Sequence, residues 1–335
     1  MADHSFAIRP AVLDWLLEPN NPSVRYFTLT GILDKPESDK EVIAARAEIM
    51  ESRWVRKILA AQQADGCWEA PNRFYTAKYR GTVWQLLILA ELGADRNDGQ
   101  IKQACEFILD NSQEGESGGF SVRGGRKGGL RSGVIPCLTG NMLWSLLRFG
   151  CGDDPRVQHG IDWVTTYQRF DDGVDDPPQG WPYDQWEICW GRHTCHMGVV
   201  KNLKALAEIP PQKRSKAIRN TIEQGAEFML LHHVHKRSHN LNRISKPGWR
   251  RLGFPLMYQT DVLEILGILT SLGYRDDRMT EAVELVLSKQ DRRGRWKLEN
   301  SYNDRVQVNI EQLGKASKWI TLNALKVLRR FPLSR

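Results

Sequence analysis

The feature that most constrains the fold is a short pattern that recurs along the chain. A Gln closes an amphipathic segment, a Gly-containing turn follows, and an aromatic residue comes next, as in Gln63–Trp68 and Gln290–Trp296. Looser copies lead to Phe120, Trp181 and Trp249. The aromatic residues stand 47 to 68 residues apart, which suits one helical hairpin and its loop. The pattern therefore predicts an architecture of repeated helix pairs.

Apolar residues recur with the period of a helix on both sides of these turns. The segments after the turns, which we predict to be inner helices, are 81–92, 138–149, 194–207, 258–272 and 317–328. The segments before the turns, predicted to be outer helices, are 53–62, 100–109, 157–167, 216–231 and 278–288. An N-terminal pair, 24–33 and 41–50, makes a sixth. The sequence thus predicts an all-α fold, a closed barrel of six inner and six outer helices that residues 1–335 form as one domain.

The tryptophans of the repeat are predicted to be structural. A Trp after Gly-X packs its ring across the preceding Gln and the neighbouring helix end, while its indole N–H finds a polar partner. We assign this role to Trp68, Trp181 and Trp296 in preference to ligand stacking.

Composition excludes several classes of protein. Of the 335 residues, 41% are apolar and 26% are charged, which is the mixture of a globular protein with a sizeable core. No run of 18 apolar residues occurs, and the first residues lack the basic and apolar regions of a signal peptide. Six scattered cysteines are too sparse for a disulfide scaffold. We therefore expect a cytoplasmic protein with reduced thiols.

The net charge of +7 raises the question of partners. The 47 Lys and Arg residues are scattered among 40 acidic ones and form no nucleic-acid motif, so no nucleic-acid partner is expected. The charge favours instead the attraction of a phosphorylated substrate, or peripheral association with an anionic membrane surface. Nothing in the sequence indicates an oligomeric state.

With its repeated Gln…Gly-X-Trp pattern, the sequence resembles the terpenoid cyclase and protein prenyltransferase superfamily, whose repeats build an α/α toroid. The resemblance covers nearly the whole chain. It implies an enzyme that acts on an apolar, isoprenoid-like substrate in a central cavity, by cyclisation, prenyl transfer or isomerisation. Fold alone does not settle the chemistry.

Two acidic motifs of this superfamily help to place the chain within it. The Asp-X-Asp-Asp motif of class II cyclases is absent. The segment Asp171–Asp175 matches the Asp-Asp-X-X-Asp pattern that holds magnesium in class I synthases, but it falls in a repeat turn that Pro177 and Pro178 keep from continuing as a helix. We expect a solvated acidic loop there, and magnesium is less favoured than zinc.

The resemblance also implies a zinc site. Prenyltransferase β subunits place an Asp-X-Cys pair and a His-Thr-Cys segment at the starts of two inner helices. Here Cys137 matches the first Cys, with Ile135 at the Asp position, and His193 matches the His. Because the Asp ligand is absent and those enzymes need a second subunit, protein prenylation itself is disfavoured.

The residues themselves also favour a metal. Cys189, His193, Cys195 and His196 lie within eight residues before an inner helix, whose dipole favours thiolate over thiol. We predict a zinc site made by Cys137, Cys189, His193 and Cys195, with a buried polar network as the alternative interpretation.

Other candidates follow from position, since the starts of inner helices converge on one mouth of the ring in this superfamily. The candidate substrate-binding residues are Tyr79, Arg80, Asn141, Lys318 and Trp319. The candidate catalytic residues are Asp261, Tyr258 and His196. Asp261 is the preferred acid, because burial of a carboxyl group near a cation suits a metal ligand or a proton donor. Each of these side chains has helix capping or a structural ion pair as its alternative role.

Two further segments stand out by composition alone. The histidines of 232–239 follow an outer helix, where cations favour the helix C-terminus, so we expect a solvated end. The Gly-rich segment 123–129 lacks the Gly-Lys-Ser/Thr ending of a phosphate loop, so a mobile linker or lid is expected.

Two other classes of function stay open. One is a noncatalytic toroid that binds a lipid, a peptide or a glycan, and the other is a carbohydrate-acting barrel enzyme that uses paired carboxylates. An apolar, aromatic-lined cavity would favour the isoprenoid enzyme. A wet acidic groove would favour the carbohydrate enzyme, and a filled centre would favour the binding protein.

Overall fold

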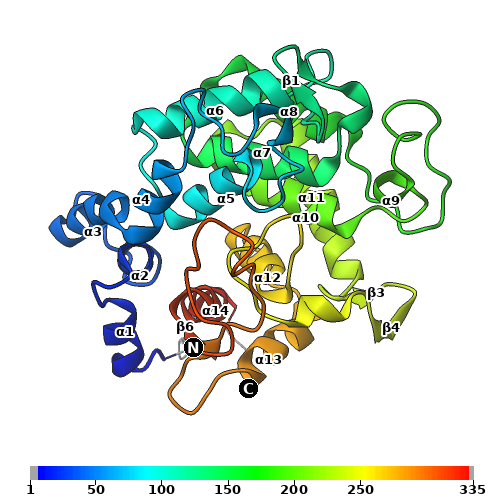
Figure 1. Cartoon of the computed structure of the whole chain (residues 1–335). Coiled ribbons are helices and arrows are strands. Elements are labelled where there is room, and N and C mark those ends of the chain that lie inside the picture. The colour runs from blue at the N-terminus through cyan, green and yellow to red at the C-terminus, as the bar shows by residue number, and fades with distance from the viewer. Residues whose placement is uncertain (1–6, 332–335) are drawn as a thin grey trace.

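The computed structural model describes residues 7–331, and helices form most of it (Figure 1). The helices after the repeat turns are α5 (Thr82–Leu92), α7 (Pro136–Arg148), α10 (His196–Ala207), α12 (Val262–Ser271) and α14 (Lys318–Arg330). The helices before the turns are α4 (Arg53–Ala60), α6 (Gly99–Ser112), α8 (Pro155–Tyr167), α11 (Lys216–Leu231) and α13 (Thr280–Ser288). The others are α1 (Pro10–Leu16), α2 (Pro22–Gly31), α3 (Lys40–Glu51) and α9 (Glu187–Trp190). The all-α prediction is confirmed.

The helices after the turns form an inner layer. In α5 every residue from Thr82 to Ala90 is buried, as in a helix that is apolar all round. In α6, by contrast, one face is buried and the other is exposed. Four outer helices, α6, α8, α11 and α13, contact α5, α7, α10 and α12 in turn. The chain is therefore a series of inner and outer helix pairs.

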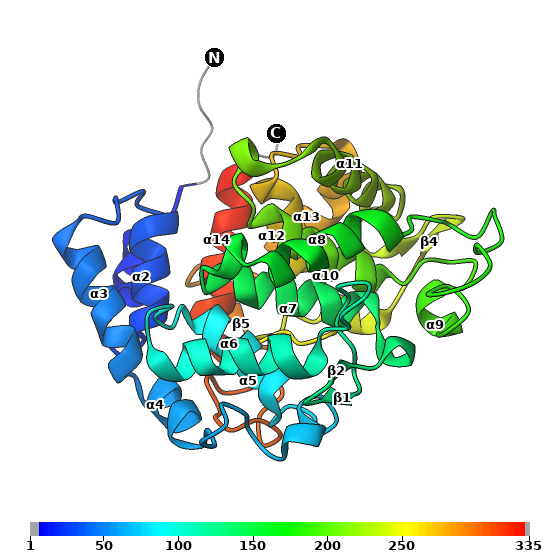
Figure 2. The ribbon, with the colours of Figure 1, turned by 90° about the horizontal axis from the view of Figure 1, so that it is seen from above.

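The inner helices contact one another in the order in which they occur along the chain. Helix α5 contacts α7, α7 contacts α10, α10 contacts α12, α12 contacts α14, and α14 contacts α2. The ring of Phe27 in α2 lies so near the end of α5 that a Cβ at Gly93 would stand 2.9 Å from its Cζ. Figures 1 and 2 both show the N-terminal helices beside α14. Elements from the two ends of the sequence thus pack together.

The turns at Trp68 and Trp296 share one set of hydrogen bonds. The backbone N–H of Trp68 donates to Thr82 Oγ1 at 3.1 Å, and its indole N–H donates to the carbonyl of Ile58 at 2.7 Å. Trp296 repeats this arrangement with Thr321 Oγ1 at 3.0 Å and a carbonyl of α13 at 2.6 Å. Both side chains are 0% exposed. Their predicted structural role is confirmed.

The same backbone bond locates the looser copies of the repeat. Phe120 donates its N–H to Thr139 Oγ1, and Asp171 donates its N–H to Thr194 Oγ1, both at 3.0 Å. Asp171 therefore occupies the aromatic position of that repeat. Trp181 is only half-buried, and its indole donates to a carbonyl in the loop before α7. The prediction that Trp181 is a repeat tryptophan is wrong, because extra residues follow the turn.

Those extra residues form what we call the 172–193 loop, which contains α9. It projects from the helical body on the side of the hairpin made by β3 (Lys236–Arg237) and β4 (Asn240–Ile244), as Figures 1 and 2 show. The loop carries several of the residues that the sequence singled out for chemistry.

Two further antiparallel hairpins are short. One joins β5 (Trp296–Lys297) to β6 (Ala316–Ser317). The other, β1 (Gly124–Gly125) with β2 (Gly128–Gly129), packs so closely on α6 that a Cβ at Gly124 would lie 2.0 Å from a carbonyl oxygen of α6. The expected mobile linker is therefore a packed hairpin, which glycine makes possible by letting two backbones approach. Within residues 7–331, no helix has the length and apolar character to cross a bilayer.

Candidate functional site

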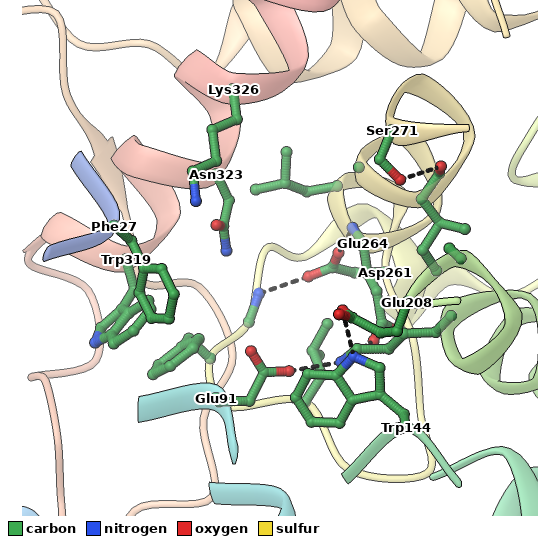
Figure 3. Close-up of a pocket in the computed structure, with 18 of the residues that line it drawn as sticks. Phe27, Glu91, Trp144, Glu208, Asp261, Glu264, Ser271, Trp319, Asn323 and Lys326 are labelled. Atoms are coloured by element: carbon green, nitrogen blue, oxygen red, sulfur yellow. Dashed lines mark hydrogen bonds and ion pairs between the residues drawn. The ribbon is translucent and has the colours of Figure 1, made fainter. Parts of the chain in front are cut away.

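A cavity of about 330 Å³ is lined by residues of six helices, and Figure 3 shows most of the side chains that line it. Each of the six helices around it contributes to its wall through one or more of the residues Phe27, Glu91, Trp144, Lys204, Glu264 and Lys326. A volume of roughly 300–1,000 Å³ is usual for a small-molecule site. The cavity is therefore the first candidate for the functional site.

Aromatic rings form one part of the wall. Phe254 and Trp319 stack with their ring centroids 4.2 Å apart and their planes 11° from parallel. The indole N–H of Trp144 donates to Glu208 at 3.1 Å, and the ammonium group of Lys204 lies 3.8 Å from the centroid of the Trp144 ring. The wall thus offers flat apolar faces, and a lysine already occupies one of them.

A closed network of ion pairs forms another part of the wall. Lys201 Nζ lies 2.7 Å from one oxygen of Glu264, while Lys204 Nζ lies 3.1 Å from the other and 2.6 Å from Glu91. Burial raises the pKa of Glu264, but the two lysines outweigh it and lower that pKa to about 2. Each charge in the network has a partner, as buried charges require.

Asp261 brings a different carboxyl group to the cavity. It caps α12: one oxygen accepts the N–H of Glu264 and the other accepts the N–H of Gly253, both at 2.8 Å. Burial raises the pKa of Asp261 to about 7, although these hydrogen bonds lower it. This carboxyl group therefore gains and loses a proton near neutral pH, and it lies beside the aromatic wall that begins at Phe254.

Asp261 and Trp319 are the only predicted site residues among those that line the cavity. The rings of Tyr79 and Tyr302 pack at a tilt of 40° with their centroids 4.3 Å apart, and Tyr258 lies edge-on to Trp84, so these rings pack together near the starts of the inner helices. Tyr79 and Tyr258, which we expected at a mouth of the cavity, therefore belong to an aromatic cluster.

The other candidates near the helix starts have structural partners. Arg80 pairs with Glu69 at 3.0 Å on the surface, and Lys318 donates to Glu18 at 2.8 Å. Asn141 is buried and donates to a backbone carbonyl at 3.4 Å. Ion pairing, one of the alternative roles weighed for these residues, describes Arg80 and Lys318, whereas Asn141 makes a buried hydrogen bond to the backbone.

The predicted zinc ligands divide into two groups. Cys137, Cys189 and Cys195 lie near one another: the pKa of Cys137 is raised to about 12 by burial and then by Cys195, and that of Cys189 by burial and then by both other thiols. His193 is 59% exposed, and its Nδ1 lies 3.4 Å from Asp172. Within residues 7–331, no three His, Cys, Asp or Glu side chains are arranged to hold a metal ion.

Asp172 is the centre of a separate cluster at the base of the 172–193 loop. His232 Nε2 and His239 Nε2 approach its carboxylate oxygens at 3.2 and 3.3 Å, and Ser238 donates to it at 2.8 Å. His232 is buried, as is His235. We expected both the acidic loop and the histidine segment 232–239 to be solvated. Both expectations are corrected in part, because the two segments pack together and each covers polar groups of the other.

His196 belongs to the edge of this cluster. Its ring centroid lies 4.1 Å from that of His232 and 5.4 Å from that of Trp249. Burial lowers the pKa of His196 to about 3, so the ring is neutral at physiological pH. It packs in this cluster and is not among the residues that line the central cavity.

Comparison with known proteins gives matches only at the level of structure. No family model matches the chain, and no curated protein matches it. The type II terpene cyclase MstE from Scytonema aligns with a TM-score of 0.42 and 14% identity over 92% of this chain and 87% of that one. A variant of MstE in complex with geranylgeranyl dihydroxybenzoate aligns with a TM-score of 0.40. A glycosidase variant aligns with a TM-score of 0.34 and 12% identity over 87% of this chain and 98% of that one.

Proposed function

We propose that the protein is an enzyme that acts on an apolar, isoprenoid-like small molecule in the central cavity, which six inner and six outer helices enclose as a closed toroid. The aromatic wall supports this proposal, since Phe27, Trp144, Phe254 and Trp319 all line the cavity. Flat apolar faces hold an unsaturated hydrocarbon and stabilise positive charge that develops on it.

The observation that carries the proposal is Asp261, a buried carboxyl group with a pKa raised to about 7 at the cavity wall. We assign to it the role of a general acid. Its O–H bond breaks as a C–H bond forms at one alkene carbon, and the positive charge passes to the neighbouring carbon. Loss of a proton from the substrate then gives an isomerised or cyclised alkene and restores the acid. Tyr258 and His196 receive no step, since neither lines the cavity.

The experiment is incubation with farnesol and geranylgeraniol in D₂O, followed by mass spectrometry of the products. We expect deuterium in the product of the wild type and of the control Asp14→Asn, an exposed carboxylate outside the cavity. Asp261→Asn should lose the reaction by about 100-fold or more, the contribution typical of a general acid. Product without deuterium, or an Asp261→Asn enzyme as active as the wild type, would contradict the assignment.

Zinc is a separate proposal. The thiols of Cys137, Cys189 and Cys195 would supply ligands, but His193 faces Asp172, and the side chains do not fit a zinc shell as they stand. We therefore assign zinc no step in the reaction. Elemental analysis of the wild type and of Cys137→Ser tests it: one zinc per chain in the first and loss in the second would support binding.

A carbohydrate-acting enzyme is the second candidate. It is favoured by the four carboxyl groups that line the cavity, Glu91, Glu208, Asp261 and Glu264. Glycoside hydrolysis uses a carboxylic acid whose pKa is raised, together with a second carboxylate that is ionised. Hydrolysis of aryl glycosides that disappears in both Asp261→Asn and Glu264→Gln would favour this candidate over the first.

A further inference from the structure

A second group of charges at the cavity differs from the closed ion-pair network. Lys326 and Arg330 lie one turn apart on α14, Arg148 ends α7, and all three line the cavity. Figure 3 shows the Lys326 side chain pointing from α14 into the cavity. The centroid of the Phe27 ring is 5.1 Å from Lys326 Nζ and 5.5 Å from the guanidinium carbon of Arg148, so the ring contacts two of these cations.

Two of these three cations lack an ion-pair partner, and the third has only a long one. Among residues 7–331, Lys326 and Arg330 have no carboxylate within ion-pair distance, and the nearest carboxylate oxygen to Arg148 belongs to Glu208 at 3.7 Å. Glu91, the other nearby acid, is bound by Lys204 at 2.6 Å. Burial, and then Arg330 and Arg148, lower the pKa of Lys326 to about 8. Lys326, Arg148 and Arg330 are each half-buried, and a cation that has lost part of its contact with water is ordinarily paired with an acid, so this arrangement needs an explanation.

The helix dipole explains only part of this accumulation of positive charge. Arg148 and Arg330 lie in the last turns of their helices, where the dipole favours a cation. Lys326 lies one turn before Arg330, the last residue of α14, so the dipole explains its charge less well. The alkyl part of its side chain lies against Gly31, the last residue of α2. A Cβ at Gly31 would stand 2.6 Å from Lys326 Cε and 3.1 Å from Nζ, so the glycine leaves room for the ammonium group to reach the cavity.

We propose that the central cavity binds a ligand with an anionic group, a carboxylate or a phosphate, which Lys326 holds together with Arg148 and Arg330. The apolar body of the ligand lies against Phe27 and the aromatic wall. An anion at this place restores the missing partner charge, and charge-assisted hydrogen bonds are the strong kind. The inference deepens the proposed function, on which it rests for the apolar body of the ligand.

The test compares four probes: decanoate, decyl phosphate, 1-decanol and inorganic phosphate. Binding is followed by tryptophan fluorescence and calorimetry at pH 7. We expect both amphipathic anions to bind about 10-fold or more tightly than the alcohol, because a hydrogen bond to a charged group is worth a factor of roughly 10 to 100. Inorganic phosphate alone should bind weakly, since it lacks the apolar body.

Two variants and a control locate the effect. Lys326→Met keeps the length of the stem and removes the charge, so it should cut the preference for the anions about 10-fold or more and leave the affinity for decanol unchanged. Gly31→Ala keeps the charge but displaces the ammonium group, and should weaken anion binding in the same direction. Arg329→Met is the control, because Arg329 lies next to Arg330 but pairs with Asp34 outside the cavity.

Each outcome decides the matter. Decanol that binds as tightly as the anions, an unchanged preference in Lys326→Met, or no binding of any probe would overturn the anionic subsite. Turnover of farnesol without a preference for anions would remove the subsite and leave the proposed reaction. A preference for anions that Lys326→Met abolishes, without turnover, would retain the subsite and remove the reaction.

Discussion

The turns at Trp68 and Trp296 and the turn at Asp171 use the same backbone hydrogen bond but bury different groups. In the first two, a fully buried indole follows the glycine turn. In the third, the N–H of Asp171 still donates to Thr194 Oγ1, but its carboxylate pairs with Arg169 and the chain continues into the 172–193 loop. The repeat is therefore fixed by the bond to the next inner helix, and the aromatic ring adds burial where the chain turns directly.

The inner helix α12 shows a variant of this bond. We call the side chain that accepts this backbone N–H the latch. In α12 the latch is a carboxyl group, because Asp261 accepts the N–H of Gly253. In three other inner-helix repeats the latch is the hydroxyl group of Thr82, Thr194 or Thr321. A carboxyl latch titrates and a hydroxyl latch does not. Within residues 7–331, α12 alone among the inner helices has a carboxyl latch, and Asp261 lies at the cavity wall, so the departure from the repeat coincides with the candidate site.

The largest expected difference between the turns comes from removing the rings. Trp68→Ala and Trp296→Ala should each lower the free energy of unfolding by about 3–5 kcal/mol, since each leaves a buried cavity. Trp181→Ala should cost about 1 kcal/mol or less, because its ring is half-buried and stacks on Arg131 at 4.4 Å. Denaturant unfolding measures all three, and a similar loss in Trp181→Ala would make the loop part of the core.

The regular turns were also the part of the molecule that the sequence predicted best. The helical period, Gly93 after α5 and the Gln–Gly–Trp copies placed the inner and outer helices, because local propensity and burial agree there. Trp181 was misplaced because nothing in its own segment shows that Asp171 has already taken the repeat position. The contacts of Asp172 with His232 and His239 join segments about 60 residues apart and leave no local pattern.

The candidate site was predicted in part. Asp261 was identified because it precedes an inner helix. Glu91 and Glu264 were missed, although each is the one charged residue of its helix, α5 or α12, and a lone charge in an apolar inner helix was a usable signal. Lys326 offered no such signal, because α14 carries lysines and arginines on several faces and only the packing shows which one enters the cavity.

The carboxyl latch should give stability a pH dependence that the hydroxyl latches lack. Because the pKa of Asp261 is about 7 in the folded state against a usual 3.8, the folded protein binds more protons than the unfolded chain between these values. The free energy of unfolding therefore falls as pH rises through this window, by at most about 4 kcal/mol. Glu264, with its pKa of about 2, acts in the opposite sense and mainly below pH 4.5.

Asp261→Asn separates this effect from the rest of the protein. Asn also caps helices well, so the fold should persist while the fall in stability between pH 5 and pH 7 is reduced. Denaturant unfolding of the wild type and the variant across this range measures the difference between the two slopes. Parallel slopes would show that Asp261 is ionised throughout, which would also remove it as a proton donor.

The smallest expected effect distinguishes the hydroxyl latches from one another. Thr82→Val and Thr321→Val each leave a buried backbone N–H without an acceptor, which costs about 1–3 kcal/mol. Thr194→Val should cost about 1 kcal/mol or less, because the N–H of Asp171 is only partly buried and water can replace the hydroxyl. Thr→Ser at the same positions keeps the acceptor and is the matched control. If Thr194→Val proved as costly as the other two, the bond to the inner helix would be equally sheltered in every repeat, and the 172–193 loop would have to be held as firmly at its base as the direct turns.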